Sequence, residues 1–161
     1  MIKVGILTVS TSGARGTRAD TSGDAIRELV ATIGGQVDAY EIIPDDRSLI
    51  AATLRAWADE RGLDLVVTTG GTGISPTDVT PEATRDVLEK ELPGLGEAMR
   101  QVSLAKTPRA ILSRAIAGTR GRTLIVNLPG SPKGVRECLD VVLPVLPHAV
   151  EILQDRPTDH R

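Results

Sequence analysis

The residues best suited to chemistry follow a short apolar run in the middle of the chain. Residues 68–83 read Thr-Thr-Gly-Gly-Thr-Gly-Ile-Ser-Pro-Thr-Asp-Val-Thr-Pro-Glu-Ala. Glycines let backbone amides approach an anion without a Cβ in the way, and threonine hydroxyls add hydrogen-bond donors. The residues predicted to bind a ligand here are Gly70, Gly71, Thr72, Gly73 and Asp78. A tight strand-to-helix turn would explain the glycine pair alone, whereas the whole string with Asp78 favours an anion-binding site.

A helix is expected to begin directly after this string. Thr80 is a suitable N-cap, and Pro81 fits the first helical turn, where its missing N–H leaves no bond unmade. The string is not the dinucleotide-binding fingerprint, which needs a glycine where Pro76 stands. It also lacks the Gly-Lys-Ser/Thr of a P-loop. The pattern therefore predicts an anion-binding turn outside these two common types.

A second glycine-containing turn follows another apolar run. Residues 127–134 read Asn-Leu-Pro-Gly-Ser-Pro-Lys-Gly. Ser131 followed by Pro132 is typical of an N-cap and a first helical residue, which alone would explain this pair. Gly130, Ser131 and Lys133 at a helix N-terminus also make a suitable phosphate cradle. We therefore predict that these three residues bind substrate.

Acidic residues precede two further predicted helices. Asp20-Thr21-Ser22-Gly23 lies before the first helix, and Pro44-Asp45-Asp46-Arg47-Ser48 lies before the second. Each carboxylate would be explained as a helix cap, worth about 1 kcal/mol. However, loops at the carboxyl ends of parallel strands share one crevice, so the anion-binding turns and the carboxylates should face one another. That combination suits phosphoryl or nucleotidyl transfer, in which amides and lysine hold phosphates while carboxylates hold Mg²⁺.

The elements that position these loops alternate between short apolar runs and helical stretches. Strands are expected at Ile2–Val9, Leu63–Thr68 and Thr123–Leu128, with a partly exposed strand at Gln36–Ile43. Helices are expected at Ser22–Ile33, Ser48–Arg61, Pro81–Glu91, Gly94–Lys106 and Pro132 to about Gln154. Pro144 and Pro147 should kink or interrupt the last helix. The alternation predicts βαβ crossovers and a three-layer α/β fold.

Length and composition limit the class of protein. With 161 residues, the chain fits a single domain, expected over residues 1–154, followed by a loose tail at 155–161. One Trp, one Tyr, no Phe and a formal charge of −2 argue against nucleic-acid binding. No apolar run is long enough to span a bilayer, and no signal-peptide pattern is present. Together with the single cysteine, these features predict a soluble cytoplasmic protein without a membrane partner.

Cysteine and histidine chemistry is not expected. Cys138 has apolar, helical flanks, which favour an inert core thiol over a reactive one. His148 lies beside Pro147 in the last predicted helix and His160 lies in the tail, so neither suits a catalytic base. One cysteine and two histidines also argue against a zinc site.

A basic segment without acidic residues runs from Arg100 to Arg136. Its eight basic residues are Arg100, Lys106, Arg109, Arg114, Arg120, Arg122, Lys133 and Arg136. A solvated surface would explain each of them singly. As a block, they are equally consistent with attraction of an anionic substrate or of an acidic neighbouring subunit.

The sequence resembles the MogA/MoaB family of molybdenum-cofactor biosynthesis proteins, which includes the G domain of gephyrin. The resemblance rests on the strings at 68–83 and 127–134, on Pro-Gly-Leu-Gly-Glu-Ala-Met-Arg at 93–100 and on Ile-Leu-Ser-Arg-Ala at 111–115. It extends from about Ile2 to Leu153. It implies a three-layer αβα sandwich with a mostly parallel sheet, and a homotrimer.

The resemblance also implies adenylyl transfer to molybdopterin. Mg·ATP would donate AMP to the terminal phosphate of the pterin and release pyrophosphate, and the product would be handed over for molybdenum insertion. Asp78 and Asp45 match the family's two functional aspartates and would be the catalytic residues that hold Mg²⁺. The substrate-binding residues, from the matching loops and the junctions beside them, are expected to be Thr8, Ser10, Asp20, Ser22, Gly70, Gly71, Thr72, Gly73, Gly130, Ser131 and Lys133.

Two departures from the family pattern leave other functions open. Thr77 stands where many relatives carry Arg, which removes one expected phosphate contact. The string at 20–23 is more similar to MoaB than to MogA. A protein that holds or hands over molybdopterin without turnover is therefore the main alternative. A magnesium-dependent phosphohydrolase acting on another nucleotide is a more distant one.

Overall fold

Strands and helices alternate along the chain, and the computed structural model describes them over residues 1–16 and 19–155. The strands are β1 (Ile2–Val9), β2 (Gly35–Ile43), β3 (Leu65–Thr69), β4 (Lys90–Glu91), β5 (Ala117–Arg120) and β6 (Thr123–Leu128). The α-helices are α1 (Thr11–Ala14), α2 (Thr21–Ala31), α3 (Arg47–Asp59), α4 (Thr80–Arg85), α5 (Pro93–Leu104), α6 (Pro132–Val142) and α7 (Leu146–Leu153). Two 3-10 turns are η1 (Pro108–Leu112) and η2 (Leu143–Val145). The tail expected at 155–161 lies outside the described residues except for Asp155.

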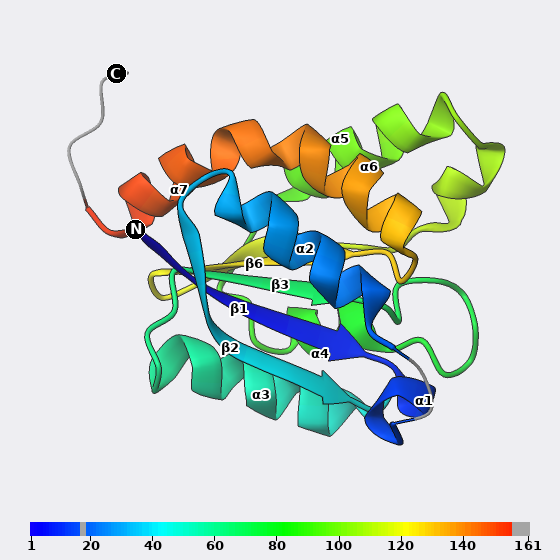
Figure 1. Cartoon of the computed structure of the whole chain (residues 1–161), viewed down its shortest axis with the longest axis horizontal. Coiled ribbons are helices and arrows are strands. Elements are labelled where there is room, and N and C mark those ends of the chain that lie inside the picture. The colour runs from blue at the N-terminus through cyan, green and yellow to red at the C-terminus, as the bar shows by residue number, and fades with distance from the viewer. Residues whose placement is uncertain (17–18, 156–161) are drawn as a thin grey trace.

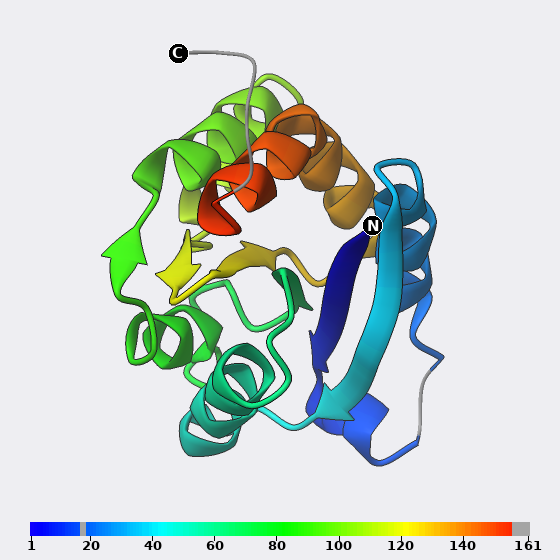
Figure 2. The same ribbon diagram turned by 90° about the vertical axis from the view of Figure 1, so that its left-hand side faces the viewer.

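The strands form one six-stranded sheet in the order β2-β1-β3-β6-β5-β4. β2, β1, β3 and β6 run parallel, whereas β5 is antiparallel to β6 and β4 is antiparallel to β5. Figure 2 shows β2 and β4 at opposite edges of the sheet. The sheet is therefore mixed and mostly parallel, as the resemblance implied. It places the carboxyl ends of four strands at one edge.

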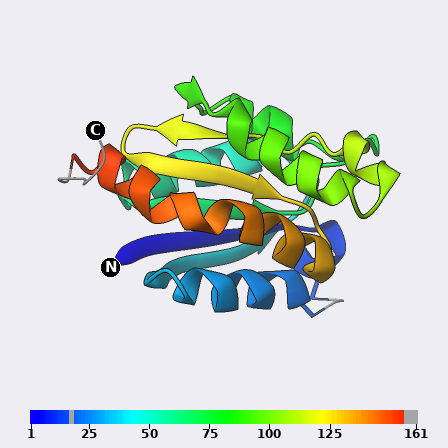
Figure 3. The ribbon, with the colours of Figure 1, turned by 90° about the horizontal axis from the view of Figure 1, so that it is seen from above.

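Helices cover both faces of the sheet (Figure 1). On one face, α2, α5, α6 and α7 pack around a core that includes Ile26 and Leu139. On the other face, α3 and α4 pack around a core that includes Leu54 and Ala83. α6 contacts both α2 and α5 and lies between them (Figure 3). The three-layer αβα sandwich is thereby confirmed.

Trp57 shapes the face of the sheet that α3 covers. It is the only tryptophan of the chain, and it is buried. Its ring lies against Gly5 of β1, because a Cβ on Gly5 would come within 2.7 Å of Trp57 Cε3. The β1–β2 register shifts between Val4 and Gly5, next to this contact. Glycine in the strand therefore lets the indole pack directly on the sheet.

Most predicted elements are confirmed within a few residues. Ile2–Val9 and Thr123–Leu128 are strands with the predicted bounds, and β2 is a partly exposed edge strand. The last helical region is interrupted as predicted, since Pro144 lies in η2 and Pro147 lies in the first turn of α7. None of the helices in the described ranges is long and apolar enough to cross a membrane.

The helix predicted at Pro81–Glu91 is wrong in its second half. α4 ends at Arg85, and the chain then turns into β4, which pairs with β5. Glu89 N donates to Thr119 O at 2.8 Å just before this pairing begins. The partner strand lies far along the chain, so tertiary pairing overrides a local helical pattern. No local pattern indicates α1, η1 or β5, which are only four or five residues long.

Candidate active site

The predicted site residues gather at the carboxyl edge of the four parallel strands. β1 leads into Ser10, β2 into the loop that holds Asp45, β3 into Gly70 and β6 into the loop that holds Gly130. Ligands bind at this edge in open α/β sheets. The topology therefore brings together loops that lie far apart in the sequence.

The larger cavity at this edge has a volume of about 650 Å³. The predicted site residues that line it are Gly71, Thr72, Gly73, Asp78, Gly130, Ser131 and Lys133. Other parts of its wall come from α5, η1 and α6, through residues such as Met99, Arg109 and Cys138. The glycine-rich turn, the carboxylate and the lysine thus surround one space.

A second cavity, of about 410 Å³, adjoins the first one. The predicted site residues that line it are Thr8, Ser10, Asp20, Ser22, Gly70, Gly130 and Ser131. Gly130 and Ser131 line both cavities, so the loop after β6 forms the boundary between them. This loop touches the turn after β3, since a Cβ on Gly130 would lie 3.4 Å from Gly70 Cα. The predicted single crevice is therefore two adjoining compartments.

The turn after β3 requires glycine at two positions. Gly70 and Gly71 have φ angles of +98° and +71°, in the left-handed region. A Cβ on Gly70 would lie 2.3 Å from Val9 O, and a Cβ on Gly71 would lie 2.3 Å from Thr80 Oγ1. The backbone amides of Gly71 and the next two residues donate to no group in the described part of the chain. These amides are therefore free to bind an anion.

Asp78 lies on the wall of the larger cavity with an oriented carboxylate. Its Oδ2 accepts a hydrogen bond from Ser75 N at 3.0 Å and would lie 2.9 Å from a Cβ on Gly73. Thr77 is exposed, and its hydroxyl lies 3.1 Å from Ser75 Oγ. The carboxylate of Asp78 therefore faces the glycine-rich turn, while the hydrogen bonds of Thr77 to described residues stay within the loop.

Asp45 lies close to the same turn but lines neither cavity. Its Oδ2 accepts a hydrogen bond from Thr11 Oγ1 at 2.9 Å, and its Oδ1 would lie 3.3 Å from a Cβ on Gly71. The N-cap of α3 is Asp46, whose Oδ1 accepts from Leu49 N at 3.0 Å. The cap explanation therefore holds for Asp46 and fails for Asp45.

Asp20 is held in the wall of the second cavity by hydrogen bonds from its own chain. Its Oδ1 accepts from Gly23 N at 2.9 Å, which caps α2. Its Oδ2 accepts from Thr8 Oγ1 at 2.7 Å and from the hydroxyl of Tyr40. Burial, and then the hydrogen bond to Asp20, raise the pKa of Tyr40. The cap explanation is therefore confirmed for Asp20, and its binding of substrate stays a prediction.

The two serines of the second cavity also bond to the chain. Ser10 Oγ accepts from Gly13 N at 3.0 Å and caps α1. Ser22 Oγ donates to Gly130 O at 2.6 Å and so connects α2 to the loop after β6. Ser22 thereby helps to fix the boundary between the two cavities.

Ser131 caps α6 as predicted, because its Oγ accepts from Gly134 N at 3.0 Å. α6 is 11 residues long, and its N-terminus opens onto both cavities through Ser131. The helix dipole adds positive potential at this end. Lys133 lies in the same turn and forms no ion pair with another described residue. This helix N-terminus therefore has the groups that a phosphate requires.

The predicted N-cap at Thr80 is wrong. Thr80 is the first residue of α4, Val79 precedes it, and no side chain of the described residues caps the helix. Thr80 N donates to Gly71 O at 3.1 Å. The side chain of Thr80 lies directly against Gly71 of the glycine-rich turn. There, its buried Oγ1 has no hydrogen-bond partner among the described residues.

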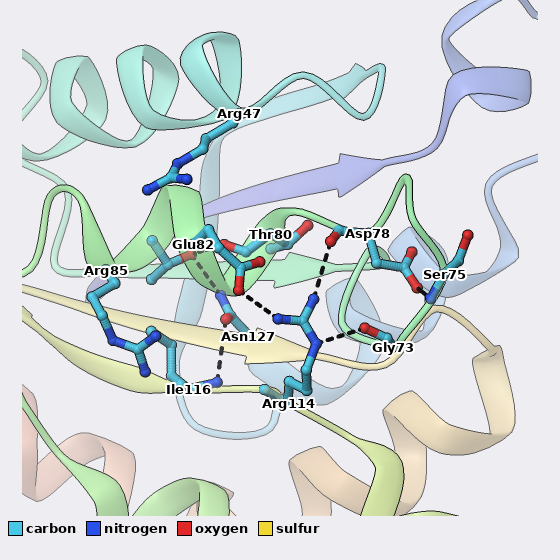
Figure 4. Close-up of polar contacts among 12 residues, drawn as sticks. Arg47, Gly73, Ser75, Asp78, Thr80, Glu82, Arg85, Arg114, Ile116 and Asn127 are labelled. Carbon is cyan, nitrogen blue, oxygen red and sulfur yellow. Dashed lines mark hydrogen bonds and ion pairs between the residues drawn. The ribbon is translucent and has the colours of Figure 1, made fainter.

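Sequence reasoning did not single out Arg114, which contacts the loop of Asp78 without lining either cavity. Its side chain donates to Gly73 O at 2.7 Å, to Asp78 O at 3.0 Å and to Glu82 Oε2 at 2.5 Å (Figure 4). The hydrogen bond from Arg114 lowers the pKa of Glu82. The signals in the sequence were the basic segment and the family string at 111–115, but neither indicates what this residue contacts.

Half of the basic residues in the segment at 100–136 form ion pairs within the chain. Lys106, Arg114, Arg120 and Arg136 form ion pairs with Glu137, Glu82, Asp59 and Glu28, respectively. Arg109 and Lys133 line the larger cavity and form no ion pair with another described residue. The charge of the segment is therefore halved, and Arg109 and Lys133 are left beside the larger cavity as cations unpaired with any described residue.

Cys138 lines the larger cavity from α6. It is buried, and burial raises the pKa of its thiol. A raised pKa keeps the thiol protonated and weakly nucleophilic. These properties support the prediction of an inert thiol.

The donors at the turn after β3 fit a magnesium ion. No cluster of three or more His, Cys, Asp or Glu suited to a metal occurs in the described ranges. Mg²⁺ does not need one, because it takes one or two carboxylates together with phosphate oxygens and water. Asp45 and Asp78 both approach this turn, and each keeps one oxygen free of hydrogen bonds to described residues. The donor set therefore suits a magnesium ion that binds together with a polyphosphate.

The fold and the site define an α/β protein whose cavities, at the carboxyl edge of its sheet, are suited to a phosphorylated ligand. Comparison with known families narrows this class. Residues 5–148 match the family described as "Probable molybdopterin binding domain", and the chain belongs to this family of molybdenum-cofactor biosynthesis proteins. The resemblance found in the sequence is thereby confirmed.

Individual relatives cover nearly the whole chain. The molybdopterin adenylyltransferase of Helicobacter pylori strain J99 is 47% identical over 154 residues, which are 94% of this chain and 88% of that protein. The molybdopterin biosynthesis enzyme MoaB from Thermus thermophilus is 58% identical, with a TM-score of 0.92 over 99% of this chain and 100% of that one. The molybdopterin biosynthesis Mog protein from Mycobacterium ulcerans is 42% identical, with a TM-score of 0.88 over 95% and 99% of the two chains.

Proposed function

We propose that the protein transfers the adenylyl group of Mg·ATP to the terminal phosphate of molybdopterin. The observation that carries this proposal is the larger cavity, where the free amides of the turn after β3, the carboxylate of Asp78 and the N-terminus of α6 with Lys133 meet. Amides and lysine bind phosphates, and a carboxylate beside them is favourable only with a cation between. Relatives named molybdopterin adenylyltransferase support the same activity.

In this reaction, a terminal phosphate oxygen of molybdopterin attacks the α-phosphorus of ATP. The bond from that phosphorus to the oxygen bridging the β-phosphate breaks, and pyrophosphate leaves. The attacking oxygen is already anionic, so the step needs no general base, and no histidine is among the described residues that line the two cavities. The chain's contribution is to position the two phosphates and to stabilise their charge.

The residues take distinct parts in this proposal. Asp45 and Asp78 would hold Mg²⁺, which neutralises phosphate charge when it is bound. Gly71, Thr72 and Gly73 offer backbone amides to one phosphate, while Ser131 and Lys133 offer the N-terminus of α6 to another. The loop after β6 separates two compartments, which suits two substrates that meet at their phosphates.

The test is to incubate the purified protein with molybdopterin and Mg·ATP and to measure adenylylated pterin and pyrophosphate by mass spectrometry. We expect equal amounts of both products, in a reaction that stops when Mg²⁺ is chelated. Tight pterin binding without either product would contradict the proposal and establish the binding-protein alternative. Nucleotide hydrolysis without pterin would instead establish a phosphohydrolase.

We further propose a cytoplasmic homotrimer that hands its product to the enzyme that inserts molybdenum. Apolar side chains exposed on α5 and η1 support self-association, and they are Val102, Leu104, Ile111 and Leu112. The charge of the acid-free segment at 100–136 does not support self-association, because four of its eight basic residues are paired within the chain. Self-association would instead bury the apolar residues.

A further inference from the structure

One arginine holds both ends of the loop that carries Asp78. Arg114 Nε donates to Gly73 O at 2.7 Å, and one terminal nitrogen donates to Asp78 O at 3.0 Å. The backbone amide of Arg114 adds a third contact, to Thr72 O at 2.9 Å. Figure 4 shows the guanidinium bonded to both Gly73 and Asp78. The guanidinium of Arg114 thus connects the two ends of the loop through their backbone carbonyls.

The loop has few other contacts that tie it to the rest of the fold. Residues 74–77 are exposed, and their hydrogen bonds to described residues all end within the loop. Asp78 itself bonds to Ser75 through both its amide and its carboxylate. These internal bonds shape the loop but do not tie it to the rest of the fold. The contacts from Arg114 provide that connection.

Glu82 fixes the arginine in turn. Its Oε2 accepts from the remaining terminal nitrogen of Arg114 at 2.5 Å. Glu82 belongs to α4, whose side chains pack on the sheet. The ion pair with Glu82 therefore anchors the guanidinium of Arg114 to a rigid element of the fold. Both side chains are about one third exposed, at 34% and 32%. An arginine is suited to this task, because its planar donors reach three acceptors in fixed directions, whereas lysine offers a single charged centre.

We propose that Arg114 is a positioning residue for the carboxylate of Asp78 in the adenylyl transfer proposed above, on which this inference rests. Arg114 does not line either cavity, so it acts through the loop and not on the substrates. Fixing the carbonyl ends of the loop holds the Asp78 carboxylate beside the glycine-rich turn. Small displacements of such groups are costly in phosphoryl transfer, because positioning supplies much of the catalysis.

The test compares Arg114→Lys with a matched control, Arg120→Lys. Arg120 also bonds a carboxylate, that of Asp59, and a backbone carbonyl, Val87 O, but it lies at the far end of β5 and lines neither cavity. For both variants we would measure kcat, the KM values for ATP and molybdopterin, the Mg²⁺ dependence, pterin affinity and melting temperature. Hydrogen exchange of the hydrogen-bonded loop amides, those of Ser75, Thr77 and Asp78, would report the loop directly.

We expect Arg114→Lys to lower kcat at least about tenfold and to require more Mg²⁺. Pterin affinity and melting temperature should match those of Arg120→Lys, which keeps its kcat. Exchange of the amides of Ser75, Thr77 and Asp78 should rise at least about tenfold in Arg114→Lys only. An active wild type whose Arg114→Lys variant keeps kcat, or whose loop exchange does not change, overturns this inference alone. A wild type without turnover overturns the proposed function together with it.

Discussion

At the scale of single residues, the charge on Asp78 is the feature most directly open to test. In Asp78→Asn, the amide oxygen can still accept from Ser75 N, so the loop should keep its shape. The loss of charge removes the partner of a cation beside the phosphates, and we expect adenylyl transfer to fall at least ~100-fold. Melting temperature and pterin affinity should stay close to the wild-type values. Near-full Mg·ATP-dependent turnover in this variant would show that the catalytic centre has been assigned wrongly.

Asp45→Asn should lower adenylyl transfer as much as Asp78→Asn does. From the sequence, Asp46 could be expected to substitute in part, because it stands beside Asp45. The structure removes this expectation, since the carboxylate of Asp46 caps α3 through Leu49 N. Asparagine at position 45 can still accept from Thr11 Oγ1, so the fold should be preserved. Activity assays of Asp45→Asn and Asp46→Asn decide the point: only the first should lose turnover, and the second should keep it.

The ion pair between Glu82 and Arg114 predicts a dependence of stability on pH. The pKa of Glu82 is lowered in the folded chain, first by its hydrogen bond from Arg114. The ionised carboxylate therefore stabilises the fold above its ordinary pKa, and this contribution is lost as the pH falls through the lowered value. The difference in unfolding free energy between wild type and Glu82→Gln should thus shrink from about pH 6 to about pH 3. A difference that grows on acidification would contradict the sign of this shift.

At the scale of elements, the N-terminus of α6 is expected to have both a structural role and a ligand-binding role. Ser131→Ala removes the cap hydrogen bond to Gly134 N, which should cost about 1 kcal/mol of stability. Ser131 also borders both cavities, so we expect pterin binding to weaken more than folding does. Thermal unfolding and pterin titration of the same variant separate the two effects. If affinity is intact while stability falls, Ser131 serves only as a cap.

The elements also show how far the sequence could predict the structure. Buried parallel strands were recognisable because both of their faces are apolar, and Ser131 was recognisable as a cap because Pro132 follows it. β4 was not recognisable, because it exists only through its pairing with β5. The same limit applies to Thr80 and Arg114, whose positions depend on backbone carbonyls of the turn after β3. Local patterns indicate elements and loops, whereas contacts between distant loops require the fold.

At the scale of the whole molecule, the exposed apolar residues of α5 and η1 predict self-association. We expect light scattering at micromolar concentration to return three times the mass of the chain. Ile111, with 67% of its surface exposed, is the residue to change. Ile111→Asp should produce monomers, because a charge would have to be buried in the interface. A wild type that is monomeric at that concentration would contradict the trimer.

Because Trp57 lies on one face of the sheet, the two faces can be followed by different spectroscopic signals. The indole packs on Gly5 under α3, so its fluorescence emission reports on that face. The opposite face, where α2, α5 and α6 lie, contains no tryptophan and does not contribute to this signal. Circular dichroism detects the helices of both faces. A temperature at which ellipticity falls while emission stays constant would therefore mark loosening of the α6 side alone, and this native chromophore needs no label to reveal it.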